Sequence, residues 1–123
     1  MADGNPRSTA QIAGHPIHPM LVPFPIAFLV ATPACDLAFW NTGSASWAVA
    51  SMWLLGAALV TAALAASAGL TDFLAEPRIR NIRAAWLHMT GNVIAVLLSL
   101  INFYLRFAAG AEAGVFPWAY GSR

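Results

Sequence analysis

The sequence contains no lysine, a single cysteine and few charged residues of either sign. Charged side chains make up 9% of its 123 residues, against about 25% in a typical soluble domain. A chain this short and this poor in charge cannot enclose an apolar core within a solvated surface, so an ordinary soluble domain is excluded. The six arginines nearly balance the five acidic residues. The sequence therefore has no excess of positive charge that would indicate a nucleic-acid partner.

The one cysteine, Cys35, excludes an internal disulfide and any metal site built from several cysteines. The sequence also lacks a nucleophile–base arrangement, a glycine loop that could hold phosphate, and a pair of catalytic carboxylates. We therefore predict that the chain has no intrinsic catalytic activity.

Apolar residues, by contrast, make up 59% of the chain and gather in three long runs. These runs occupy residues 20–40, 47–70 and 86–105. At about 1.5 Å per residue, a helix over each run crosses a hydrocarbon core of about 30 Å. No strongly basic head precedes the first run and further runs follow it, which indicates an uncleaved span and not a signal peptide. The sequence thus predicts an all-α bundle of three transmembrane helices at residues 20–106, with the lipid bilayer as its main partner.

Two short segments flank this bundle. Residues 1–19 form an N-terminal tail that ends in a His-Pro entry segment. His15 and His18 each precede a proline, which favours extended backbone at both histidines. Residues 107–123 form a C-terminal segment that is too brief to cross the bilayer again.

The arginines predict how the bundle is oriented. The loop at residues 71–85 carries Arg78, Arg80 and Arg83, whereas the loop at residues 41–46 carries none. Positively charged loops stay on the cytoplasmic side of a membrane. We therefore expect the second loop and the N-terminus in the cytoplasm, and the first loop outside.

A polar stripe runs along the third span at helical spacing. It consists of His88, Asn92, Ala95, Ser99, Asn102 and Arg106. Polar side chains in a span face protein or water and not lipid, so this stripe should point inward. At its outer end, Arg106 can meet Asp36 of the first span if the two helices are neighbours. The alternative is a purely structural Asp36, either protonated or hydrogen-bonded to Asn102.

The remaining polar residues gather at the cytoplasmic end of the bundle. This layer holds His15, His18, Asp72, His88 and Asn92. Neutral imidazole ligates haem iron and divalent metals, and a carboxylate can orient it. His88 on its helix and either His15 or His18 on the entry segment could thus hold haem b or a divalent metal across a gap, with His18, His88 and Asp72 the favoured residues. The same residues could instead relay protons, or they could merely cap helices and bond to backbone.

The segment Gly14–Ala27, with two His-Pro pairs followed by a proline-studded apolar run, resembles the opening of the DUF2231 family of bacterial membrane proteins. Further matches are Asp36, the Gly-Leu-Thr-Asp-Phe sequence at residues 69–73, and His88 with Asn92. The resemblance covers roughly residues 14–106 and implies a multi-pass protein of the bacterial cytoplasmic (inner) membrane.

The family resemblance also implies a fourth helix. In the family pattern a further span follows a segment like Gly114–Trp118, whereas this sequence stops at Arg123. We therefore expect a truncated four-helix bundle whose polar stripe is open on one flank, and which forms a homo-oligomer or joins a membrane partner subunit. Some relatives look like the membrane portion of larger redox proteins, which by analogy favours haem.

These observations lead to one main functional hypothesis and two alternatives. The main hypothesis is a non-catalytic membrane subunit or anchor with a histidine-based haem or metal site at the cytoplasmic face. The first alternative is a small proton-handling or transport protein that uses the histidines and Asp72. The second is a purely structural membrane protein.

Overall fold

The computed structural model describes residues 9, 11–12 and 15–115, and the predicted all-α bundle is confirmed. The long helices are α2 (Pro23–Thr42), α3 (Ala45–Ala75) and α5 (Arg83–Ala109). The short elements are β1 (Gln11–Ile12), β2 (His15–Pro16), α1 (Ile17–Leu21), α4 (Pro77–Arg80) and a 3-10 turn, η1 (Ala111–Gly114). Three helical stretches are long and apolar enough to cross a membrane: Ile17–Thr42, Ala45–Ala75 and Arg83–Ala109.

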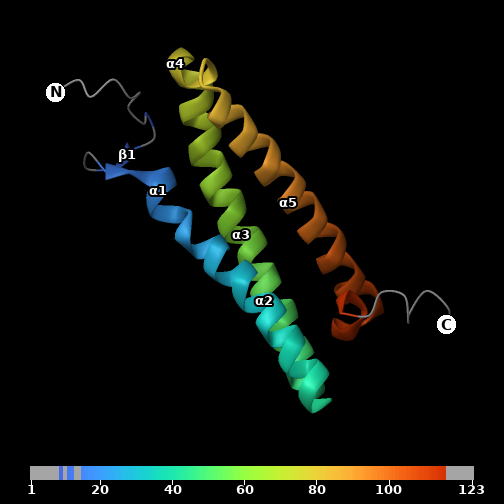
Figure 1. The fold of residues 1–123 in the computed structure, drawn as a ribbon. Coiled ribbons are helices and arrows are strands. Elements are labelled where there is room, and N and C mark those ends of the chain that lie inside the picture. The colour runs from blue at the N-terminus through green and yellow to red at the C-terminus, as the bar shows by residue number, and fades with distance from the viewer. Residues whose placement is uncertain (1–8, 10, 13–14, 116–123) are drawn as a thin grey trace.

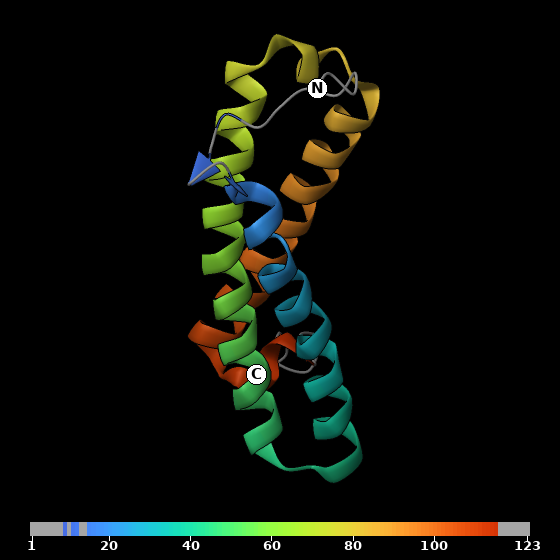
Figure 2. The ribbon, with the colours of Figure 1, turned by 90° about the vertical axis from the view of Figure 1, so that its left-hand side faces the viewer.

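The helices are arranged around α3 (Figure 1). Helices α2 and α3 form an antiparallel hairpin that packs along its length, and α5 runs beside α3 on its other side. The view turned by 90° shows α1 and α2 continuing one another along α3, with α5 behind them (Figure 2). Helix α5 makes most of its remaining contacts with η1, which folds back on its last turns. The molecule is therefore a tight hairpin with a more loosely attached third helix.

The helix ends follow from local sequence. Helix α2 begins with Pro23, where the missing N–H has no intrahelical acceptor in any case. It ends at Gly43, which adopts a left-handed conformation with φ 69° and donates its N–H to the Phe39 carbonyl. At the other end of α3, the Arg80 guanidinium donates to the carbonyls of Phe73 and Leu74. These carbonyls lie in the last turn of α3, where further helical donors run out.

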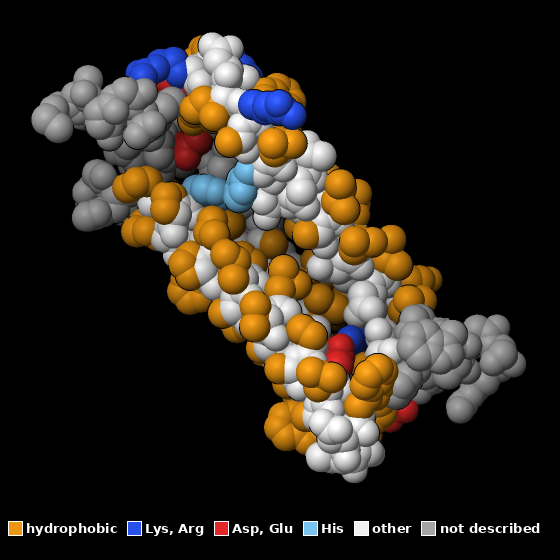
Figure 3. Space-filling model, in the orientation of Figure 1, with side chains coloured by type: hydrophobic (Ala, Val, Ile, Leu, Met, Phe, Trp, Pro, Cys, Tyr) orange, Lys and Arg blue, Asp and Glu red, His pale blue; other side chains and the backbone are white. Residues whose placement is uncertain are grey.

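Small side chains allow the close packing of the hairpin. The buried residues on α3 are Ala48, Ser51, Leu55, Ala58, Ala65, Ala68, Asp72 and Phe73. In lipid, the hydrophobic effect does not drive helices together, because the acyl chains are as apolar as the helix surfaces. Helices associate there through the close packing that small side chains allow. Large apolar side chains instead cover the outside of the molecule (Figure 3), as expected for a surface that faces acyl chains.

The backbone at the two entry histidines differs from one to the other. His15 is extended in β2, as predicted, while the side chain of His15 lies outside the described part of the chain. The prediction of extended backbone at His18 is wrong, because His18 lies inside α1. Pro19 falls in the first turn of that helix, where backbone N–H groups have no intrahelical acceptor, so the proline costs no hydrogen bond.

Candidate functional site

His18 is fixed by a contact between α1 and α3. Its Nδ1 lies 2.7 Å from the carbonyl oxygen of Ala65 and, facing an acceptor, carries the proton. Gly69 makes this approach possible, because a Cβ at that position would lie 2.8 Å from Nδ1 of His18 and 2.9 Å from Cε1. With Nδ1 protonated, Nε2 is the unprotonated nitrogen of the neutral ring. Its lone pair can ligate a metal or accept a proton.

His88 reaches the same place from α5. The two imidazole rings have their centroids 6.2 Å apart and stand edge to face, with an interplanar angle of 86°. Asn92, one turn further along α5, donates its amide to the His88 carbonyl at 2.7 Å and lies 3.2 Å from Nδ1 of the ring. In the space-filling view, histidine side chains lie at the surface, close to an acidic side chain (Figure 3). Histidines from two helices therefore face each other at an accessible position.

Asp72 has a different role from the histidines. Its Oδ1 accepts from the backbone N–H of Thr9 at 2.7 Å and from the Thr9 hydroxyl at 3.1 Å, and the residue is buried. Asp72 thus ties the segment before α1 to the end of α3. Among the residues that the structure describes, no three His, Cys, Asp or Glu side chains are grouped so that they could hold a metal ion.

The polar stripe of α5 points inward only in its second half. Arg106 is buried and Asn102 is half-buried, whereas His88 and Asn92 are exposed. The inward orientation predicted for the whole stripe therefore needs correction for its first half. The reason is that α5 packs chiefly on α3 and η1, which leaves the start of its polar face open.

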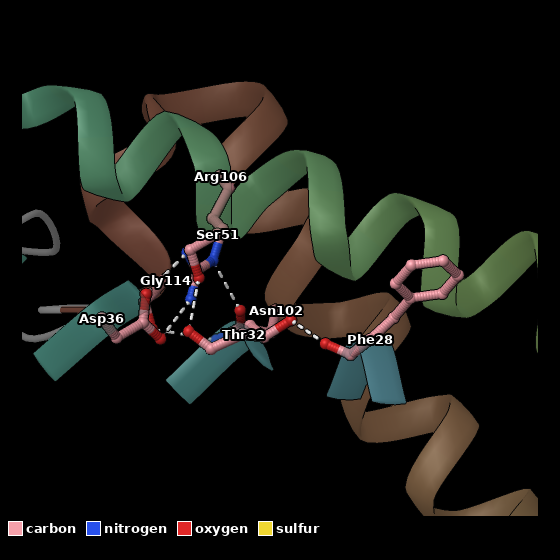
Figure 4. A network of polar contacts seen from close by, with 7 residues as sticks. All are labelled: Phe28, Thr32, Asp36, Ser51, Asn102, Arg106 and Gly114. Atoms are coloured by element: carbon pink, nitrogen blue, oxygen red, sulfur yellow. Dashed lines mark hydrogen bonds and ion pairs between the residues drawn. The ribbon is translucent and has the colours of Figure 1, made fainter. Parts of the chain in front are cut away.

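A charged cluster, made of Asp36, Asn102, Arg106 and Gly114, joins the C-terminal parts of α2 and α5 (Figure 4). The Arg106 guanidinium donates two parallel hydrogen bonds to the Asp36 carboxylate, at 3.1 Å from Nη1 and 2.8 Å from Nη2. Its Nε donates to Oδ1 of Asn102 at 2.8 Å. Arg106 is 2% exposed. Such two-pronged pairing is among the strongest polar contacts a protein forms.

Helix η1 closes this cluster. Nδ2 of Asn102 donates to the Gly114 carbonyl at 2.9 Å. A Cβ at Gly114 would collide with the Arg106 side chain and would lie 2.7 Å from Oδ1 of Asn102. Asn102 therefore forms hydrogen bonds with Arg106 and with η1. Asp36 pairs with Arg106 and not with Asn102, which was the alternative expected from the sequence.

Sequence reasoning grouped His18 with His88, which the structure brings together, but it missed the contacts of two glycines: Gly69 seats His18, and Gly114 packs against Arg106. Both glycines were named only within segments that carry the family resemblance, and no local signal pointed to these contacts. The contact of Thr9 with Asp72 and the turn η1 carried no signal either, because both are held by partners distant in sequence.

The fold and its apolar exterior define an integral membrane helical bundle. The family model described as "Predicted membrane protein (DUF2231)" matches residues 14–122, so the chain belongs to this family. Searches of curated proteins and of solved structures found no match.

Proposed function

We propose that this protein is a non-catalytic subunit or anchor of the bacterial cytoplasmic membrane that binds a metal-containing group between His18 and His88. The observation that carries the proposal is the meeting of the two imidazoles from α1 and α5, with ring centroids 6.2 Å apart. Polar side chains in a membrane span are costly, and a pair such as half-buried His18 and exposed His88 is typically functional.

The spacing of the rings fits shared coordination. Two imidazoles that bind one ion through nitrogens at about 2 Å have ring centres roughly 5 Å apart at a tetrahedral angle and roughly 6 Å apart on opposite sides of the ion. Because the rings stand edge to face, one of them has to turn before both nitrogens point at a shared ion. The hydrogen bond from His18 Nδ1 to the Ala65 carbonyl is the kind of outer contact that fixes the tautomer of a ligating histidine. Asn92 holds His88 in a similar way.

The donor set favours haem over a bare divalent ion. Structural zinc requires four protein ligands, and the described residues offer no third His, Cys, Asp or Glu beside the pair. Haem supplies the other iron ligands from its own ring and needs only axial side chains from the protein. His18 and His88 would hold the haem iron, and the haem would supply the electron-transfer chemistry.

The test is the absorption spectrum of the detergent-purified protein, expressed with adequate haem, before and after reduction with dithionite. We expect a Soret band that is lost in His18→Ala and in His88→Ala, and retained in Thr90→Ala, which changes an exposed residue on the same helix. Metal analysis of the same samples reports any ion bound without haem. A folded wild-type protein with neither haem nor metal would contradict the proposal and leave the histidines a structural or proton-handling role.

We further propose that the histidine pair lies at the cytoplasmic side of the membrane. Arg78, Arg80 and Arg83 surround α4, while the turn between α2 and α3 carries no positive charge. The positive-inside rule then places α4 in the cytoplasm.

Labelling with a membrane-impermeant maleimide tests this orientation. In a Cys35→Ser background, we expect Ser44→Cys to be labelled in intact spheroplasts and Asn81→Cys only after permeabilisation. Both positions are exposed and lie at opposite ends of α3. The reverse labelling pattern would require the opposite orientation.

A further inference from the structure

An open pocket lies beside the charged cluster, between α2, α3 and α5. Its volume is about 260 Å³. The apolar part of its lining includes Leu29, Leu55 and Leu98, and the polar part includes Thr32, Asp36 and Ser99. We propose that this pocket binds a primary ammonium group, either from the headgroup of an aminophospholipid or from a small free amine. The proposal does not depend on the function proposed for the histidines, which lie toward the other end of the bundle.

The hydroxyl groups of the pocket have already used their hydrogens. The Thr32 hydroxyl donates to the Phe28 carbonyl at 2.8 Å, and the Ser99 hydroxyl donates to the Ala95 carbonyl at 2.8 Å. A hydroxyl has one hydrogen to donate and two lone pairs to accept with. Both groups can therefore only accept from a ligand.

The two charged residues of the pocket, Asp36 and Arg106, differ in how far they are exposed. The Asp36 side chain is 22% exposed, whereas that of Arg106 is 1% exposed. The carboxylate is thus the more accessible of the two charged groups, while the guanidinium, which also lines the pocket, directs three of its N–H donors to Asp36 and Asn102. Two hydrogen bonds from Arg106 leave lone pairs on the carboxylate free, because a carboxylate accepts about four bonds.

These lone pairs select the ligand. Asn102 and Arg106 also line the pocket, but Arg106 is almost fully buried and Asn102 already gives one amide hydrogen to Gly114. An anion or a carbonyl compound would therefore meet mostly acceptors, and most of its own lone pairs would go unpaired, which is costly away from water. An ammonium group has three donors and no acceptor, and it matches one carboxylate and two hydroxyl oxygens. The three leucines provide apolar surface for the carbon chain that bears the amine.

The position of the pocket favours a lipid as the source of the amine. Asp36 and Arg106 lie toward the helix ends where exposed Trp40 and Trp47 flank the turn between α2 and α3. Tryptophan concentrates at the level of lipid headgroups. A headgroup amine at that depth can reach the carboxylate while its acyl chains lie along the apolar surface of α2 and α5.

Native mass spectrometry of the detergent-purified protein tests the proposal with two lipids of equal chain length. Phosphatidylethanolamine carries an ammonium with three N–H donors, and phosphatidylcholine carries a quaternary ammonium with none. We expect phosphatidylethanolamine to bind at least tenfold more tightly. Free ethanolamine is titrated separately, and binding of ethanolamine that the lipid displaces would support the small amine as the ligand.

Two substitutions locate the binding. Leu98→Trp should fill the pocket and weaken phosphatidylethanolamine binding at least fivefold without touching the ion pair, whereas Leu97→Trp places the same side chain on the neighbouring position, which does not line the pocket. Asp36→Asn should abolish the preference for ethanolamine over choline. Equal binding of the two lipids with no binding of ethanolamine, or loss of binding in Leu97→Trp alone, would overturn the proposal. So would a protein dimer that Leu98→Trp dissociates without any lipid preference, since a second copy would then cover the pocket.

Discussion

Replacing Arg106 with alanine is expected to lower the free energy of unfolding by about 3 kcal/mol, toward the smaller end of the cost of breaking a buried pair. The substitution leaves the Asp36 carboxylate, which lines a pocket of mixed polar and apolar residues, without a cation, and it removes the bond from Nε to Asn102. The partial exposure of Asp36 allows some rescue by water, which is why the smaller figure applies.

Unfolding of the purified protein in mixed micelles measures this effect. Arg83→Ala is the matched control, because Arg83 is an exposed arginine on the same helix, and such changes usually alter stability by less than about 0.5 kcal/mol. The double variant Asp36→Ala/Arg106→Ala should lose less unfolding free energy than the sum of the two single variants, because neither charge is then left unpaired. Equal losses of unfolding free energy in Arg106→Ala and Arg83→Ala would show that the Asp36–Arg106 pair does not stabilise the bundle.

Gly69→Ala should weaken the proposed binding at His18 and His88 by about 10- to 100-fold, although neither histidine is changed. The new methyl group would lie 2.8 Å from Nδ1 of His18, so the imidazole must leave the Ala65 carbonyl. Without that bond the ring loses both its fixed tautomer and its orientation toward His88. Titration of the apoprotein with haem, followed by absorbance, gives the affinity directly.

Gly91→Ala is the control for this experiment. A Cβ at Gly91 meets nothing within 4 Å, so alanine there should leave haem affinity unchanged while favouring the helix slightly. Unchanged haem affinity in Gly69→Ala, in a protein whose helicity is intact, would show that His18 does not bind the group.

The sequence predicts the three long apolar helices of this protein well because membrane burial acts on whole runs of residues. The helices extend beyond the predicted runs, as α3 does from Ala45 to Ala75, because capping and interfacial residues continue a helix outside the apolar region. The meeting of Asp36 with Arg106 could also be foreseen. Each charge is expensive in a bilayer, and the two lie toward the same side of the membrane.

Tertiary contacts determine the side-chain positions that could not be predicted from the sequence. His18 is helical despite the following proline, and its ring is placed by a carbonyl on α3 far along the chain. Asp72 was grouped with the histidines by depth alone, yet its carboxylate bonds to Thr9. Periodicity assigns a residue to a helix face, but it does not say how closely the neighbouring helix approaches that face.

The charged cluster also determines the order in which the protein can be assembled. Asp36 and Arg106 are 70 positions apart, and the carboxylate is synthesised first. The hairpin of α2 and α3 therefore enters the membrane with an acid that has no cation until the ribosome has completed α5. In the orientation proposed above, Arg106 lies in the last turn of α5 on the far side of the membrane, so its charge crosses the bilayer before the pair can form. Locking of the third helix then follows insertion of the hairpin, and a ribosome that stalls before Arg106 would leave an inserted but unlocked hairpin for membrane proteases.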